Sequence, residues 1–132
     1  MISRLDELLN FHATALDVRT QRQQLLAANV ANADVPHYKA RDVDFAQALQ
    51  QALAPAVAGG MAVTSTRHLP GAAPQGTAAQ PLYRVPLQDS LDGNTVELDV
   101  ERAQFADNAV HIEANLTFLG AQIKTMLAAL QG

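Results

Sequence analysis

The four histidines of this chain are the first candidates for chemistry, because histidine can ligate a metal ion or transfer a proton near neutral pH. They are His12, His37, His68 and His111. No two of them stand four residues apart, the spacing that places two metal ligands on one face of a helix. If the two ends of the chain pair as helices, His12 and His111 approach each other, with Glu113 nearby. Because a histidine at a mixed helix interface is commoner than a metal site, we expect no metal and no cofactor.

The carboxylates Glu97, Asp99 and Glu101 resemble a general acid and base pair only superficially. They come at the expected start of a helix, where negative side chains are favourable for electrostatic reasons alone. Gly59-Gly60 lacks the lysine and the helix of a phosphate-binding loop. The chain has no cysteine, which excludes disulfides, cysteine-ligated zinc and thiol catalysis. We therefore find no active site in the sequence and expect no enzyme.

Charge and hydropathy bound the partners and the compartment. The net charge of -4 provides no basic patch that would displace phosphate counterions, so nucleic acid is not an expected partner. The acids Asp6 and Glu7 stand where a signal peptide has its apolar run. No apolar run is long enough to span a bilayer. On these grounds alone the sequence predicts a cytosolic protein without membrane insertion.

The elements that would position these residues are two long helices, one at each end of the chain. Between Asp99, a candidate cap, and Leu130, apolar residues recur at alternating steps of four and three, which is typical of a coiled-coil seam. This seam consists of Phe105, Ala109, Ile112, Leu116, Leu119, Ile123, Met126 and Leu130. A helix of that length with one apolar stripe is not stable alone in water, so it needs a partner.

A stripe with the same spacing makes the N-terminal helix, over residues 3–32, the natural partner. Its members are Leu5, Leu9, His12, Leu16, Arg19, Gln23, Leu26 and Val30. If the chain folds back, the two helices run antiparallel, with Leu5 near Met126 and Leu26 near Phe105.

Two arginines interrupt the middle of the N-terminal stripe. In an antiparallel pair Arg19 and Arg22 would come within reach of Asp107 or Glu113. Alternatively they lie on a solvated helix face, where ion pairs contribute little.

Turn residues separate the first helix from the middle of the chain. Asn32 and Asp34 suit a helix terminus and a turn, and Pro36 prevents continuation of the helix. Asp44 can cap a short helix over residues 45–53, whose apolar face carries Phe45, Ala48, Leu49 and Ala52.

Beyond this short helix the composition changes. Alanine, glycine and proline dominate residues 54–81, which we expect to be a flexible insertion. Residues 82–87 alternate enough to predict a short extended piece, and Asp92-Gly93-Asn94 predicts a turn.

The sequence therefore predicts a mainly α fold, in which long N- and C-terminal helices pair as an antiparallel coiled-coil-like hairpin around an irregular, partly extended middle segment. The expected division is an N-terminal helix over residues 1–33, a turn and short helix over 34–53, a flexible middle over 54–94 and a C-terminal helix over 95–132.

The segment at the end of the first helix carries a family resemblance. Residues 29–39, NVANADVPHYK, resemble the N-terminal signature of the bacterial flagellar axial proteins, which form the rod, the hook and the hook-associated structures. Residues 38–45, YKARDVDF, look like the proximal rod proteins of that family. The sequences YRVP at 83–86 and LDGNTVELDVE at 91–101 support the same assignment. One departure is His37, where the signature usually has a glycine that would permit a positive φ.

This resemblance covers about residues 5–53 and 82–132, and it implies a non-enzymatic subunit of the proximal rod of the flagellar basal body. Such subunits stack helically into the drive shaft that transmits torque and houses the export channel. The implied partners are copies of itself, other flagellar rod proteins, membrane-ring and rod-adaptor proteins at the rod base, and the flagellar type III export apparatus. Export to the periplasmic rod would then need no cleavable signal peptide, and the destination would not be the cytosol.

On this interpretation the assembly contacts are made by seam residues and by the turn after the first helix. The seam residues are Leu5, Leu9, Leu16, Leu26, Phe105, Ile112, Leu116, Leu119, Ile123 and Met126, and the turn residues are Asn29, Asn32, Asp34, Pro36 and Tyr38. Two alternatives remain open, another axial rod component and an enzyme acting on peptidoglycan. The enzyme would need a catalytic carboxylate or a metal in a cleft.

Overall fold

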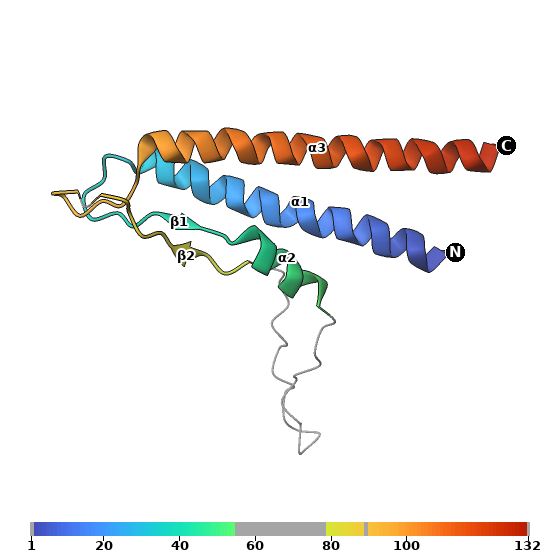
Figure 1. Ribbon diagram of the computed structural model, residues 1–132, viewed down its shortest axis with the longest axis horizontal. Coiled ribbons are helices and arrows are strands. Elements are labelled where there is room, and N and C mark those ends of the chain that lie inside the picture. The colour runs from blue at the N-terminus through green and yellow to red at the C-terminus, as the bar shows by residue number, and fades with distance from the viewer. Residues whose placement is uncertain (1, 55–78, 89, 132) are drawn as a thin grey trace, which may run out of the picture.

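The two long helices lie side by side and antiparallel, so that both ends of the chain are at the same end of the molecule (Figure 1). The structure is a computed structural model, and it describes residues 2–54, 79–88 and 90–131. In chain order its elements are α1 (Ile2–Ala31), β1 (Arg41–Asp42), α2 (Phe45–Leu53), β2 (Leu82–Tyr83) and α3 (Leu98–Gln131). The predicted fold, mainly α with paired terminal helices and an irregular, partly extended middle, is confirmed.

The helix boundaries follow local chemistry in one case and depart from the prediction in another. Asp44 caps α2 as predicted, because its carboxylate accepts a hydrogen bond of 3.1 Å from the Gln47 amide. The prediction that Asp99 caps the C-terminal helix is wrong. That helix already begins at Leu98. Asp99 lies in its first turn, where its negative charge interacts favourably with the helix dipole.

The apolar core is small and does not lie along the whole length of the helix pair. It is formed by Val18 of α1, Val43 after β1 and Ala48 of α2, and the partly buried Leu25 and Phe45 pack against it. This core fixes α2 and the strand segment to one side of α1, as Figure 1 shows. The contact between α1 and α3 must therefore be held by other interactions.

A short antiparallel ribbon completes the fold. Arg41 pairs with Tyr83 and Asp42 with Leu82, so β1 and β2 are joined across a long stretch of sequence. Residues 34–53, expected to form a turn and a short helix, therefore also contain a strand, whereas the extended piece expected over 82–87 is present as β2. The expected flexibility of residues 55–78 concerns residues outside those that the structure describes.

Candidate assembly site

The seam predicted on α1 faces α3. His12 Nδ1 lies 2.5 Å from Asn115 Oδ1, Arg19 Nη1 donates to Asn108 Oδ1 at 3.2 Å, and Gln23 Nε2 donates to the Phe105 carbonyl at 3.4 Å. As α1 residue numbers rise, the α3 numbers fall, which confirms the predicted antiparallel orientation. The register differs by about one helical turn, because Arg19 bonds Asn108, whereas a pairing of Leu26 with Phe105 would place Arg19 opposite Ile112.

The side of α3 that faces α1 is not the apolar seam predicted from the sequence. Glu101 and Asn108 are completely buried, and Asn115 and Gln122 are half-buried. These four residues recur every seven positions, which places them in one line along the helix, and we call them the polar row. The apolar stripe predicted as the seam therefore lies to one side of the contact with α1, and the polar row lies at the centre of that contact.

The predicted apolar stripe divides into two rows, one next to the polar row and one farther from it. The inner row, which flanks the polar row and is half-buried apart from its first member, consists of Phe105, Ile112, Leu119 and Met126. The outer row is exposed and consists of Ala109, Leu116, Ile123 and Leu130. Leu116 is 53% exposed and Ile123 is 42% exposed, so the chain itself leaves the outer row largely uncovered. Contiguous apolar surface of this kind marks interaction sites.

A network of charged side chains joins four segments of the chain. Arg84 bonds the carboxylates of both Glu101 and Asp42, and it reaches Asp42 Oδ2 at 2.7 Å. Arg22 forms a bidentate pair with Asp42, with distances of 2.8 and 3.0 Å. Both arginines also donate to Gln104 Oε1, at 3.0 Å from Arg22 and 2.8 Å from Arg84. The two positive and two negative charges balance, and the network ties α1, β1, the residue after β2 and α3 together.

The predicted partners of the arginines are thus replaced by others. Hydrogen bonds from Arg22 go to Asp42 and Gln104 rather than to Asp107 or Glu113. Arg19 packs its guanidinium over the Phe45 ring, 3.7 Å from the centroid, in addition to its bond with α3. Burial and the neighbouring charge of Arg22 lower the pKa of Arg19, and the Asp107 charge only partly opposes them.

Asp42 gives this network a pH dependence. Burial alone would raise the pKa of Asp42, but hydrogen bonds from Arg22, the Val43 amide and Arg84 outweigh burial and hold that pKa below its ordinary value. A carboxyl whose pKa is lower in the folded than in the unfolded chain stabilises the fold at pH values above its unfolded pKa, and the contribution is lost as the pH falls through the folded pKa.

We therefore expect the urea midpoint of the purified chain to fall as the pH is lowered from 6 to about 3, in the range where carboxyls titrate. The variant Asp42→Asn should show a lower midpoint at pH 6 and a shallower decline below it. An equally steep decline in Asp42→Asn would assign the acid sensitivity to other carboxyls.

Asn29, predicted as a turn residue of the assembly joint, lies at the centre of the chain's own contacts. Its side chain is completely buried. Its amide group donates to the Arg41 carbonyl at 2.7 Å and to Glu101 Oε2 at 3.1 Å, and its oxygen accepts from the Arg41 amide at 3.1 Å. The Tyr38 hydroxyl approaches the same oxygen at 3.4 Å. Asn29 thus pairs with the edge of β1 as another strand would.

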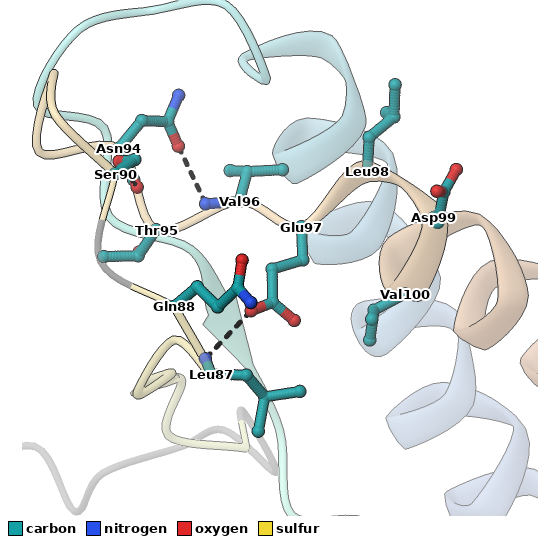
Figure 2. Close-up of a pocket in the computed structure, with 10 residues that line it drawn as sticks. All are labelled: Leu87, Gln88, Ser90, Asn94, Thr95, Val96, Glu97, Leu98, Asp99 and Val100. Carbon is teal, nitrogen blue, oxygen red and sulfur yellow. Dashed lines mark hydrogen bonds between the residues drawn. The ribbon is translucent and has the colours of Figure 1, made fainter.

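Asn94 closes the end of the molecule where α1 ends and α3 begins. Its side-chain amide donates to three carbonyls after α1, those of Asn32, Ala33 and Val35, at 3.1, 2.7 and 2.9 Å. Its side-chain oxygen accepts from the Val96 amide at 2.8 Å, as Figure 2 shows. The sequence predicted a turn at Asn94, but it did not reveal these hydrogen bonds to the carbonyls of the turn after α1.

The same end contains the position where the family signature usually has glycine. His37 has a φ of 62°, so the left-handed conformation that a glycine would favour is retained with a histidine in place. Gly93 opposite also has a positive φ, of 70°, and a Cβ there would lie 2.9 Å from His37 Nδ1. The His37 amide donates to the Asp92 carbonyl at 3.0 Å, which holds the two turns together.

The remaining candidate contact residues differ in how far the chain covers them. Leu26 is completely buried, and Leu5, Leu9, Leu16, Asn32 and Tyr38 are half-buried. Asp34 and Pro36 are exposed on the turn after α1. A surface that neighbours can reach therefore includes the outer row and this turn, whereas Leu26 and Asn29 serve packing within the chain.

The groups considered for catalysis do not converge. Glu97 accepts a hydrogen bond of 2.8 Å from the Leu87 amide, and its side chain and that of Asp99 point in different directions (Figure 2). His111 lies 3.7 Å from Asp107 on the same helix, and His12 bonds Asn115. Over the described ranges, no three histidine or acidic side chains are grouped closely enough to hold a metal ion. Within these ranges no helix is long and apolar enough to cross a membrane.

Comparison with known proteins assigns the family. Residues 9–39 match the family described as flagella basal body rod protein. The chain is 51% identical over its whole length to the flagellar basal body rod protein FlgB of Salmonella typhimurium, of which it covers 99%. It is 47% identical to FlgB of Escherichia coli (strain K12), and 41% identical to FlgB of Cereibacter sphaeroides over 94% of both chains. The chain belongs to the FlgB family of flagellar basal body rod proteins. Membership in the FlgB family confirms the resemblance and the prediction of a structural rod subunit of the flagellar basal body.

Proposed function

We propose that this FlgB-type chain builds the proximal rod by helical stacking, and that the outer row of α3 is its main contact with neighbouring subunits. The observation that carries the proposal is the exposure of this row along a helix whose other apolar row is already half-covered by α1. A helix from a neighbouring subunit would bury Leu116 and Ile123, each at about 25 cal/mol per Å² of apolar surface. Because such head-to-tail contacts do not close on themselves, they produce a filament.

The partially buried members of the α1 seam belong to the same proposed surface. Leu5, Leu9 and Leu16 are half-buried. A neighbouring subunit would complete the burial of these side chains. At the other end, Asp34 and Pro36 with the half-buried Asn32 and Tyr38 would shape the joint between subunits.

The finer partners and the route of export follow from the family resemblance. We propose contacts with copies of this chain, with other rod proteins, and with membrane-ring and adaptor proteins at the rod base. We also propose delivery to the periplasmic rod by the flagellar type III export apparatus without a cleavable signal peptide. The resulting shaft would transmit torque and house the export channel.

We propose a building block without catalysis. A peptidoglycan-acting enzyme would need free carboxylates in a cleft. Two of the three acids at the start of α3 already have structural partners, since Glu97 bonds the Leu87 amide and Glu101 pairs with Arg84.

The test is the variant Leu116→Asp, expressed in cells that lack their own copy of the gene. We expect loss of basal-body rods and of swimming, because a charge in the outer row would have to be desolvated on assembly. The level of the protein should stay normal, because Leu116 is exposed in the single chain.

Val110→Asp is the matched control. Val110 is 65% exposed on the same helix but belongs to neither apolar row, so this variant should assemble and swim. Normal swimming of Leu116→Asp would contradict the assignment of the outer row as the contact surface.

A further inference from the structure

Two rows of α3 compete for the surface of α1. The polar row faces α1 in the structure, and the outer row lies on the other flank of the inner row. A turn of α3 about its own axis would exchange them, bringing Leu116 and Ile123 against α1 and moving Asn108 and Asn115 outward. That exchange would bury more apolar surface within the chain, which the hydrophobic effect favours.

Hydrogen bonds oppose the exchange at successive turns of α3. The side-chain amide of Asn108 donates to the Arg19 carbonyl at 2.9 Å and to Gln23 Oε1 at 2.6 Å. One heptad further on, Asn115 donates to the His12 carbonyl at 3.3 Å while its oxygen faces the His12 ring. Each of these amides is thus matched on both its donor and its acceptor side, and a turn of the helix would separate them from their partners.

At the C-terminal end of the polar row, the observed rotation of α3 leaves one buried polar atom without a hydrogen bond. Gln122 Oε1 is buried and has no hydrogen-bond partner among the described residues. A single buried polar residue in a coiled-coil seam is known to fix orientation at a cost in stability. The polar row has the spacing and the contacts for that role.

We propose that Asn108 and Asn115 are specificity-determining residues for assembly, because they fix the rotation of α3 so that the outer row stays available to neighbouring subunits. This inference rests on the proposed function of the outer row. It adds that the chain leaves the apolar side chains of the outer row unpacked within the subunit, so that they can pack against a neighbouring subunit.

The experiment measures the accessibility of the outer row in the purified full-length chain. The chain has no cysteine, so Leu116→Cys introduces a single thiol. Its rate of reaction with a maleimide is compared in the wild-type background and in the background Asn108→Ala with Asn115→Ala, which removes the hydrogen bonds without making the polar row as apolar as the outer row. We expect the rate to fall by about tenfold in the double-alanine background, because the thiol at position 116 then packs against α1 and reacts only through local opening of the helix pair.

Two controls make the result specific. Ala121→Cys, exposed and outside both apolar rows, should react at the same rate in both backgrounds. Asn10→Ala makes the same chemical change at an exposed position of α1 and should leave the rate at position 116 unchanged. The single variant Asn115→Ala is a milder test and should slow the reaction in the same direction.

A second readout separates a role in specificity from one in stability. If the asparagines set the rotation, the double-alanine chain should keep a cooperative urea transition, because the outer row then packs against α1, and yet fail to form rods in cells. An unchanged or faster reaction at position 116, or loss of the cooperative transition, would overturn the proposal. Because the labelling uses the single chain, that outcome would leave the outer row as a contact surface, which Leu116→Asp tests separately.

Discussion

Replacing Arg84 with methionine is expected to destabilise the chain by about 3 kcal/mol or more, as for other buried ion pairs that lose one partner. Glu101 is completely buried, and without Arg84 its carboxylate would keep, among the described residues, only the hydrogen bond from Asn29. Asp42 would retain Arg22, so the loss falls mainly on Glu101. Because the whole stability of such a domain is only about 5–15 kcal/mol, the urea midpoint should drop strongly.

The matched control is Arg102→Met, which removes the same side chain from an exposed position of α3 and should change the midpoint little. Adding Glu101→Gln to Arg84→Met should recover part of the lost stability, because the unpaired charge is then removed. If Arg84→Met were no less stable than Arg102→Met, the network would not be what joins α3 to the ribbon.

The helices were predictable from the sequence because their periodicity is a property of each segment alone. The stripe on α1, with His12, Arg19 and Gln23 among its members, identified the face that contacts α3. Asp44 also predicted the start of α2, since a capping side chain bonds backbone amides within one turn of its own position.

The rotation of α3 was not predictable from the apolar pattern, because that pattern ranks faces only by hydrophobicity. Asn108 is buried because particular atoms of Arg19 and Gln23 satisfy it, and such partners are not visible in the spacing of one helix. A signal was nevertheless present. Glu101, Asn108, Asn115 and Gln122 recur every seven residues beside the apolar stripe.

The charged network could not be predicted from the sequence, for a different reason. Asp42, Arg84 and Glu101 lie far apart in the sequence, and they meet only because β1 pairs with β2. Two-residue strands carry almost no periodic signal. The sequence therefore indicated that residues 82–87 are extended but not that Arg84 would be placed against α3.

Removing the side chain of Asn94 is the second change with a large expected effect. Asn94→Ala deletes the donors to the carbonyls of Asn32, Ala33 and Val35, and it also deletes the acceptor for the Val96 amide. At about 1 kcal/mol for each hydrogen bond, and with some of the carbonyls gaining water instead, we expect a loss of about 2–3 kcal/mol in the free energy of unfolding. Urea denaturation followed by circular dichroism measures this loss.

Asn94→Asp distinguishes the hydrogen bonds from the shape of the side chain. Aspartate has nearly the same volume and keeps the acceptor for Val96, but it turns a carboxylate oxygen toward carbonyl oxygens in place of the donor. It should therefore lose more stability than Asn94→Ala, whereas a shape-only role would make it the milder change. The damage should begin locally, so hydrogen exchange should accelerate first at the Val35 and Tyr38 amides of the turn that Asn94 holds. Equal acceleration along the whole of α1 would instead mean that Asn94 supports the helix pair as one unit.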